Sequence, residues 1–249
     1  MRHLVNLGAV IASVAMAMAV AAGTGYKLGW WDLRMGFDIL EWAFYAGAGA
    51  AAIGLLGLLF SQRRGVSLLI LLIGGAVAAM ICLQVMAARS VPPIHDITTD
   101  LDNPPEFIAV LDLRKEGENS TDYAGKMAPP DKETGEVRHY ADVQRGAYPH
   151  IAPAYLDLNE ESCFDLAFDT AKGEGWEIVA SSKAEGRIEA TDTTFWFGFK
   201  DDVVIRLTME EEDSCRVDMR SASRIGVSDV GVNAKRIASY MLALEKAAG

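Results

Sequence analysis

Acidic side chains are almost missing from the first 90 residues of this 249-residue chain. Only Asp32, Asp38 and Glu41 occur there, against six Lys or Arg residues, whereas residues 91–249 contain 31 acidic and 17 basic side chains. The acidic part has no basic patch interleaved with aromatic residues. Because an acidic surface repels phosphate groups, this composition argues against nucleic acid as a partner and against docking on anionic lipid headgroups.

Charged side chains are also missing from the middle of three long apolar runs, at about residues 4–22, 39–60 and 66–88. Each run is long enough to cross a hydrocarbon core of about 30 Å as a helix, which takes about 20 residues. Ionisable groups inside the membrane are the usual mark of proton relays and transport pathways, so their absence argues against a transporter or pump. Residues 1–90 are therefore predicted to form a three-helix transmembrane anchor. Small residues at helical spacing would allow close contact between these helices: Ala46, Ala50, Gly54, Gly74, Gly75, Ala78 and Ala79.

The residues that flank the runs predict their orientation. Tryptophans mark one interface, at Trp30, Trp31 and Trp42. Arg63 and Arg64 lie in the turn between the second and third runs and place that turn in the cytoplasm. We therefore expect a bacterial inner-membrane protein with a cytoplasmic N-terminus and a periplasmic C-terminal domain. The first run also fits a cleavable signal peptide, and either alternative leaves the C-terminal domain on the same side.

Residues 91–249 are expected to form an α+β domain. Residues 91–158, rich in Pro and charge, are predicted to be a lead-in that is mostly extended or loop, and residues 159–249 a compact core. A helix should begin at Asn159 and end near Gly173, and a last helix should follow Ser228 and Asp229. Between them, alternating patterns predict four strands at about 176–182, 187–199, 203–209 and 216–225. One face of these strands is apolar and the other charged, which predicts an antiparallel four-stranded sheet with both helices packed on the apolar face.

Several phrases in the domain resemble a bacterial family, the domain of unknown function 1499. They are Pro93-Ile94-His95-Asp96-Ile97-Thr98-Thr99-Asp100, Asn103-Pro104-Pro105, Gln144-Arg145, Ala147-Tyr148-Pro149, Gly186-Arg187-Ile188-Glu189-Ala190-Thr191, Phe197-Gly198-Phe199-Lys200-Asp201-Asp202-Val203, Val217-Asp218-Met219-Arg220-Ser221-Ala222-Ser223-Arg224, Gly226 and Ser228-Asp229. The resemblance covers about residues 91–245 and leaves the membrane runs outside. It implies a domain boundary near residue 91 and brings no established reaction or cofactor.

The charged face of the sheet supplies the candidate ligand-binding residues. If the apolar faces of the third and fourth strands coincide, paired residues must have numbers with an even sum. A short turn near Asp213 then places Arg206 close to Arg220. Like charges directly opposite destabilise a strand pair, so a negative group should lie between the two arginines. That group is either an internal carboxylate, in a structural ladder of ion pairs, or a bound carboxylate or phosphate. The candidates are Glu189, Asp202, Arg206, Asp218, Arg220 and Arg224.

Other constellations in the domain are weaker. His95, Asp96, Asp100 and Asp102 are the densest group of metal-ligand residue types, but their spacing fits neither a zinc site nor a calcium loop. We therefore predict no metal and no cofactor. The stretch 226–231 resembles a nucleophile elbow, but its second glycine comes one residue late, which argues against a serine hydrolase.

The three cysteines differ in their expected chemistry. Cys82 lies in the third apolar run and should be a reduced, unreactive thiol. Cys163 and Cys215 belong to the domain, where an oxidising periplasm permits a disulfide, but sequence does not give their separation. A disulfide and two buried thiols therefore remain alternatives.

These features favour a membrane-anchored envelope protein without enzymatic activity, whose outer domain binds a partner protein or a small anionic ligand through the charged face. A first alternative is an envelope enzyme that uses carboxylates such as Asp96, Asp202 or Asp218 as acid and base. A second is a structural or assembly component of a membrane complex.

Overall fold

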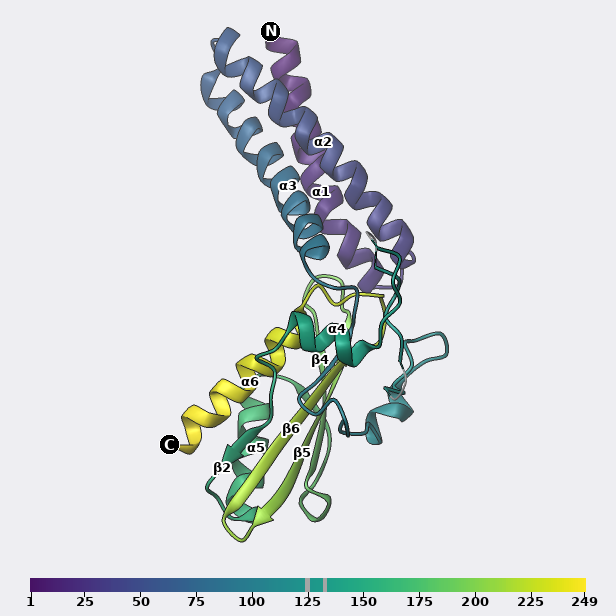
Figure 1. The fold of residues 1–249 in the computed structure, drawn as a ribbon. Helices are drawn as coiled ribbons and strands as arrows, with labels where there is room; N and C mark the ends of the chain where they lie inside the picture. Colours follow the sequence, from purple (N-terminus) through teal and green to yellow (C-terminus); the bar gives the residue numbers. More distant parts are fainter. Residues whose placement is uncertain (124–125, 132–133) are drawn as a thin grey trace. The chain divides into compact units, whose positions relative to one another are not determined.

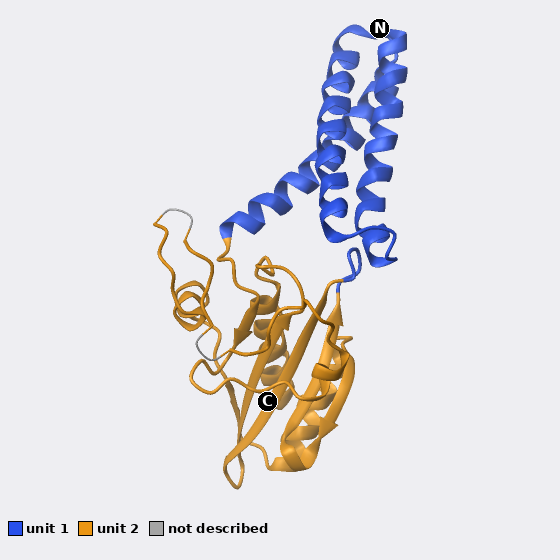
Figure 2. Ribbon diagram, turned by 90° about the vertical axis from the view of Figure 1, so that its right-hand side faces the viewer, with its two compact units in different colours: residues 1–90, 194–198 blue, residues 91–193, 199–249 orange. Residues whose placement is uncertain are grey.

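The computed structural model describes residues 1–123, 126–131 and 134–249. The chain divides into two compact units, which Figure 2 shows in different colours. The first unit consists of residues 1–90 and 194–198, and the second of residues 91–193 and 199–249.

Three helices make up most of the first unit: α1 (Arg2–Lys27), α2 (Leu33–Phe60) and α3 (Arg64–Ser90). All three are long and apolar enough to cross a membrane, so the three predicted apolar helices are confirmed. Glycines let α2 and α3 approach closely, since a Cβ added at Gly54 would lie only 2.5 Å from the Leu71 amide nitrogen. Close backbone approach through small residues is the usual way in which helices associate in lipid.

Residues 194–198 also belong to the first unit, although the sequence predicted a strand that continues to about Phe199. The strand β4 (Arg187–Thr193) ends before them, because the Gly198 amide donates to the Thr194 carbonyl at 3.0 Å and closes a turn. Gly198 has φ +69°, in the left-handed region that glycine adopts without strain. The strand end predicted at Phe199 was therefore wrong.

A six-stranded antiparallel sheet forms the centre of the second unit (Figure 1). Four strands follow in sequence, β3 (Glu177–Ser182), β4, β5 (Lys200–Glu211) and β6 (Ser214–Ser223), and they lie in the sheet order β6-β5-β4-β3. Two additional short strands, β1 (Asp96–Thr98) and β2 (Ala154–Leu156), pair with β6. The antiparallel sheet is confirmed with six strands rather than four, because three-residue strands are too short to show an alternating pattern.

Two helices pack on the apolar face of this sheet, as predicted. They are α5 (Glu160–Gly173) and α6 (Val232–Ala248), and their buried side chains share one core with the inward residues of β4, β5 and β6. The Asn159 side chain caps α5 by accepting from the Ser162 amide at 2.9 Å, and Asp229 accepts from the Asn233 amide in the first turn of α6 at 2.8 Å. The structure also joins Cys163 of α5 to Cys215 of β6 in a disulfide, the alternative that the sequence left open.

The charged face of the sheet is covered by part of the lead-in, including the short 3₁₀ helix η1 (Ala109–Leu113). Charged side chains bond to the backbone of this segment: Glu189 accepts from the Val110 amide at 2.9 Å and Arg224 donates to the Leu113 carbonyl at 2.9 Å. An irregular segment pairs only some of its backbone groups internally, so buried charged side chains that bond to the others remove a large desolvation cost. The lead-in also contains a helix that the sequence did not predict, α4 (Tyr140–Ala147).

Candidate functional site

The β5–β6 register decides which charged side chains meet. Paired residues have numbers with an even sum, as predicted, but Arg206 faces Asp218 and Arg220 faces Val204. The expected facing of Arg206 and Arg220 was therefore wrong, because the partner of Arg206 lies two residues before Arg220 on β6. The arginine directly opposite Arg206 is Arg187 on β4, which bonds to Glu189 at 3.1 Å.

Arg220 and Asp96 form an enclosed ion pair, and neither is more than 3% exposed. The Arg220 Nε and Nη2 atoms donate to the two Asp96 carboxylate oxygens at 2.9 and 2.8 Å, the bidentate geometry that suits a guanidinium. The guanidinium also lies 4.8 Å from the ring centre of Phe107 and 5.3 Å from that of Tyr123. Burial alone would raise the pKa of Asp96, but the bonds from Arg220 and the charge of Lys126 hold the pKa below its usual value.

His95 extends this enclosed cluster. Its Nε2 atom lies 3.2 Å from the Lys126 ammonium nitrogen, and its Nδ1 atom lies 3.0 Å from the Tyr140 hydroxyl. Since an ammonium group can only donate, Nε2 must accept, which places the proton of the neutral ring on Nδ1. Burial, reinforced by the Lys126 charge, lowers the pKa of His95 and favours this neutral form.

Asp202 and Arg224 form a second buried pair, with Arg224 Nη2 at 2.8 Å from Asp202 Oδ1. Arg114 approaches the same carboxylate at 3.6 Å, and burial lowers the pKa of Arg114. Glu189 is likewise buried and paired, so the candidate residues that lie deepest are satisfied internally. This is the structural ladder that the sequence offered as one of two alternatives.

The enclosed Asp96 carboxylate is poorly suited to act as a general acid. A general acid needs a proton near neutral pH, whereas Asp96 is held in its ionised form by Arg220 and Lys126. The weak metal-site candidates do not share one site, because Asp96 forms an ion pair with Arg220 and Asp100 forms an ion pair with Arg206. Over residues 1–123, 126–131 and 134–249, no three His, Cys, Asp or Glu side chains are grouped so as to hold a metal ion.

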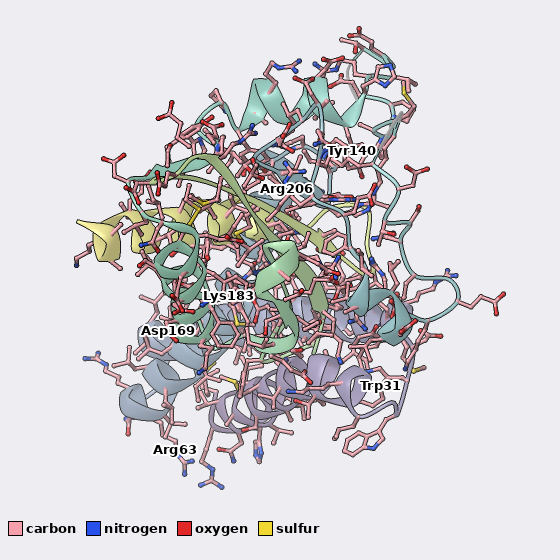
Figure 3. The ribbon with its side chains drawn as sticks, turned by 90° about the horizontal axis from the view of Figure 1, so that it is seen from below. Trp31, Arg63, Tyr140, Asp169, Lys183 and Arg206 are labelled. Atoms are coloured by element: carbon pink, nitrogen blue, oxygen red, sulfur yellow. A yellow bond between two sulfur atoms is a disulfide. The ribbon has the colours of Figure 1, made fainter. Side chains whose placement is uncertain are left out.

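One part of the charged face is accessible, and we call it the open patch. It consists of Asp100, Tyr155, Arg206, Thr208 and Arg216, which lie around the buried carboxylate of Asp218. The side chains of Arg206 and Arg216 are 25% and 27% exposed, and Tyr155 is 58% exposed. Thr208, Arg216 and Tyr155 form a row across β5, β6 and β2, since Arg216 is the partner of both others. Arg206 is labelled in Figure 3.

Asp100 connects the two arginines of the open patch. Its Oδ2 atom accepts from Arg206 Nη2 at 3.0 Å and from Arg216 Nη2 at 2.9 Å, and Asp218 lies against both. Burial raises the pKa of Asp100. The hydrogen bond from the Asn103 backbone amide and the positive charges of Arg216 and Arg206 outweigh burial, so the pKa lies below its usual value. The Arg206 Nε atom is buried and has no hydrogen-bond partner among the described residues. The open patch therefore holds two carboxylates, Asp100 and the buried Asp218, between two arginines, and the Arg206 Nε donor is left over.

Sequence reasoning found part of the open patch and missed the rest. Arg206 and Asp218 were candidates from their place on the charged face. Arg216 could have been found from the same alternation, because it precedes Asp218 by two residues on the same strand. No sequence pattern pointed to Tyr155, because it lies in a strand of only three residues within a segment predicted to be loop.

The fold and the site together define a class: an α+β domain with a largely paired charged sheet face, carried on a chain with three membrane-length helices. The chain belongs to the family described as protein of unknown function (DUF1499), whose model matches residues 96–244. No curated protein matches the chain. Among solved structures, the crystal structure of TTHA0849 from Thermus thermophilus is similar at 13% identity, over 38% of this chain and 90% of that chain, with a TM-score of 0.22. A similarity of this size supports no statement about function.

Proposed function

We propose that this protein is an inner-membrane-anchored binding protein, whose periplasmic domain recognises an anionic group of a partner through the open patch. The observation that carries the proposal is the shared carboxylate: two partly exposed arginines converge on Asp100, at 3.0 and 2.9 Å. A carboxylate or phosphate of a partner has the same chemistry as the Asp100 side chain and can take its place between the guanidinium groups.

Tyr155 supports a protein or a larger ligand as the partner. It lies exposed beside Arg216, and tyrosine and arginine are both enriched among the residues that contribute most to binding energy at protein interfaces. The other candidate residues of the charged face are buried, and several of them bond to the lead-in. The candidates Arg220, Arg224, Asp202 and Glu189 therefore position the lead-in. Arg206 belongs to the recognition surface, and the buried Asp218 carboxylate holds it from beneath.

Two features support the proposed location. The disulfide between Cys163 and Cys215 is a bond that persists in an oxidising compartment such as the periplasm. Arg63 and Arg64 lie where α2 ends and α3 begins, and basic residues in short turns are retained in the cytoplasm.

A pull-down from detergent-solubilised membranes tests the proposed function. The tagged full-length protein, the Arg206→Ala/Arg216→Ala variant and a Lys183→Ala control are compared, with native mass spectrometry of each eluate. Lys183 is also a surface cation paired with carboxylates, Glu161 and Asp165, but it lies outside the open patch. We expect a co-purifying protein or small mass that the double variant loses and the control keeps. The same species in all three eluates would contradict the proposal.

The alternative of an assembly component has one observation in its favour. An open groove of about 570 Å³ lies along α1 and reaches Ile73 of α3. Small residues of α1 line it, among them Ser13, Ala17 and Ala21, and such residues suit the approach of a further helix. Under this alternative, Ala17→Leu would remove co-purifying membrane proteins, while Arg206→Ala/Arg216→Ala would not.

A further inference from the structure

Residues 194–198 include three consecutive aromatic side chains, Phe195, Trp196 and Phe197, which differ in their exposure and contacts. Phe197 is 6% exposed, and its ring centre lies 6.1 Å from that of Tyr26 and 5.8 Å from that of Phe37. Phe195 is 93% exposed, the highest value among the exposed large apolar side chains of the described residues. Two aromatics of the segment are thus packed or bonded within the first unit, and one projects from it.

Trp196 and Phe197 fit against the end of α1 because residue 23 is glycine. A Cβ on Gly23 would lie 2.5 Å from Trp196 Cδ1 and 2.8 Å from Phe197 Cδ2. The Trp196 indole nitrogen donates to the Val20 carbonyl at 3.3 Å. The segment is therefore fitted to the helix end by shape as well as by a hydrogen bond.

The same end of the helices has the composition of a membrane–water interface. Trp30 is 68% exposed and stacks edge-on with Trp31, whose indole nitrogen donates to the Ala22 carbonyl at 3.0 Å. Aromatic residues with an apolar body and a polar edge gather at this depth of a bilayer. Lys27, the last residue of α1, adds a cation on a long apolar stem, which is typical of side chains that reach from the bilayer toward the headgroups.

Lys27 also binds the segment directly. Its ammonium nitrogen donates to the Phe195 carbonyl at 3.1 Å and lies 5.7 Å from the centre of the Phe195 ring. The exposed ring is thereby held next to a group that marks the interface, while its carbonyl oxygen is hydrogen-bonded. A hydrogen-bonded carbonyl lowers the free-energy cost of placing the backbone at this depth, where little water is present to hydrogen-bond it.

We propose that residues 194–198 form an interfacial anchor, in which Phe195 inserts into the bilayer at the boundary between headgroups and acyl chains. The Phe195 ring contacts lipid of the same membrane that α1, α2 and α3 cross. Insertion is driven by the apolar ring rather than by charge, so it does not require anionic lipid. The anchor is independent of the open patch and of any partner bound there.

Site-directed spin labelling of the full-length protein in phospholipid nanodiscs tests the anchor. A single cysteine replaces Phe195 on a Cys82→Ser background, and the accessibility of the nitroxide to oxygen and to a water-soluble nickel complex is measured. Leu56 and Lys115, exposed residues of a helix and of the second unit, give the apolar and aqueous references. We expect the label at residue 195 to be more accessible to oxygen than to nickel, with the opposite order at Lys115.

Two other outcomes would overturn the proposal. An accessibility at residue 195 equal to that at Lys115 would place the segment in water. Low accessibility to both reagents would mean that protein, not lipid, covers the residue. Gly23→Ala supplies a second test, since its Cβ removes the fit of Trp196, and the label should become more mobile and more accessible to nickel. Gly49→Ala is the matched control, because an added Cβ there meets nothing within 4 Å.

Discussion

The Arg220 guanidinium and the Asp96 carboxylate meet through two parallel hydrogen bonds inside the second unit, at 2.9 and 2.8 Å. They join β1 to β6, and Arg220 also donates to the carbonyls of Pro105 and Thr121 in the lead-in. One side chain therefore connects the sheet to the segment that covers it.

Arg220→Ala is expected to destabilise the second unit by about 3–5 kcal/mol, because it leaves the Asp96 charge buried and short of its main partner. Urea unfolding of the detergent-solubilised protein, monitored through the hydrogen exchange of β6 amides, measures the change in unfolding free energy. Arg145→Ala is the control, since Arg145 pairs with Asp142 at the surface with 59% of its side chain exposed, and a change of about 0.5 kcal/mol or less is expected. Equal effects of the two substitutions would refute the structural role of the enclosed pair.

The pKa of His95, lowered by burial and by Lys126, predicts a pH dependence of stability. The folded protein binds this proton more weakly than the unfolded chain, whose histidine has a pKa of about 6.5. Stability from this group is therefore present above about pH 6.5 and is lost as the pH falls toward the folded-state pKa. His95→Gln should flatten the slope of unfolding free energy against pH in this window. His150→Gln, at an exposed position, is the control and should retain the slope of the wild type. A wild-type slope in His95→Gln would contradict the pH dependence predicted for His95.

The disulfide between Cys163 and Cys215 closes a sequence separation of 52 residues, for which chain entropy gives about 4 kcal/mol of stabilisation. Cys163→Ala/Cys215→Ala should therefore lower the unfolding temperature of the second unit, measured by circular dichroism with and without reductant. Cys82→Ser should leave the unfolding temperature and its response to reductant unchanged. If alkylation of the unreduced protein labels Cys163 and Cys215, the bond is not formed in the cell.

Gly54→Ala is expected to separate α2 from α3, because its Cβ would lie 2.5 Å from the Leu71 nitrogen and 2.8 Å from the Ser67 carbonyl oxygen. Backbone atoms cannot move aside as a side chain can, so we expect a loss of about 1–3 kcal/mol. Resistance of the helices to unfolding in sodium dodecyl sulfate measures the change. Gly75→Ala, where an added Cβ meets nothing within 4 Å, should behave like the wild type. No difference between the two would mean that this helix contact is absent in the membrane.

The sequence predicted the long elements well because each has a strong local signal. Apolar length predicted α1, α2 and α3, and alternation predicted the order of the four main strands. Asn159 correctly predicted the start of α5, since its side-chain oxygen accepts from a free amide of the first turn. Asp229 also accepts from an amide in the first turn of α6, but that helix begins at Val232 with Gly231 as its N-cap.

The site was harder to predict, because its residues are brought together by long-range pairing. Arg206 and Asp100 are separated by 106 positions in the chain, and no periodicity connects them. The even-sum rule gave the correct faces, but the position of the β5–β6 turn determined that Arg206 faces Asp218 instead of approaching Arg220. Which arginines remain exposed depends on the path of the lead-in, and an irregular segment has no sequence pattern from which to read that path.

Photo-crosslinking at Tyr155 tests the central claim most directly. A photoreactive amino acid replaces Tyr155 in the full-length protein in its native membrane, because this side chain is 58% exposed and adjoins Arg216. We predict a discrete adduct that disappears in the Arg206→Ala/Arg216→Ala background and persists in the Lys183→Ala background. No adduct, or the same adduct in both backgrounds, would contradict recognition by the open patch.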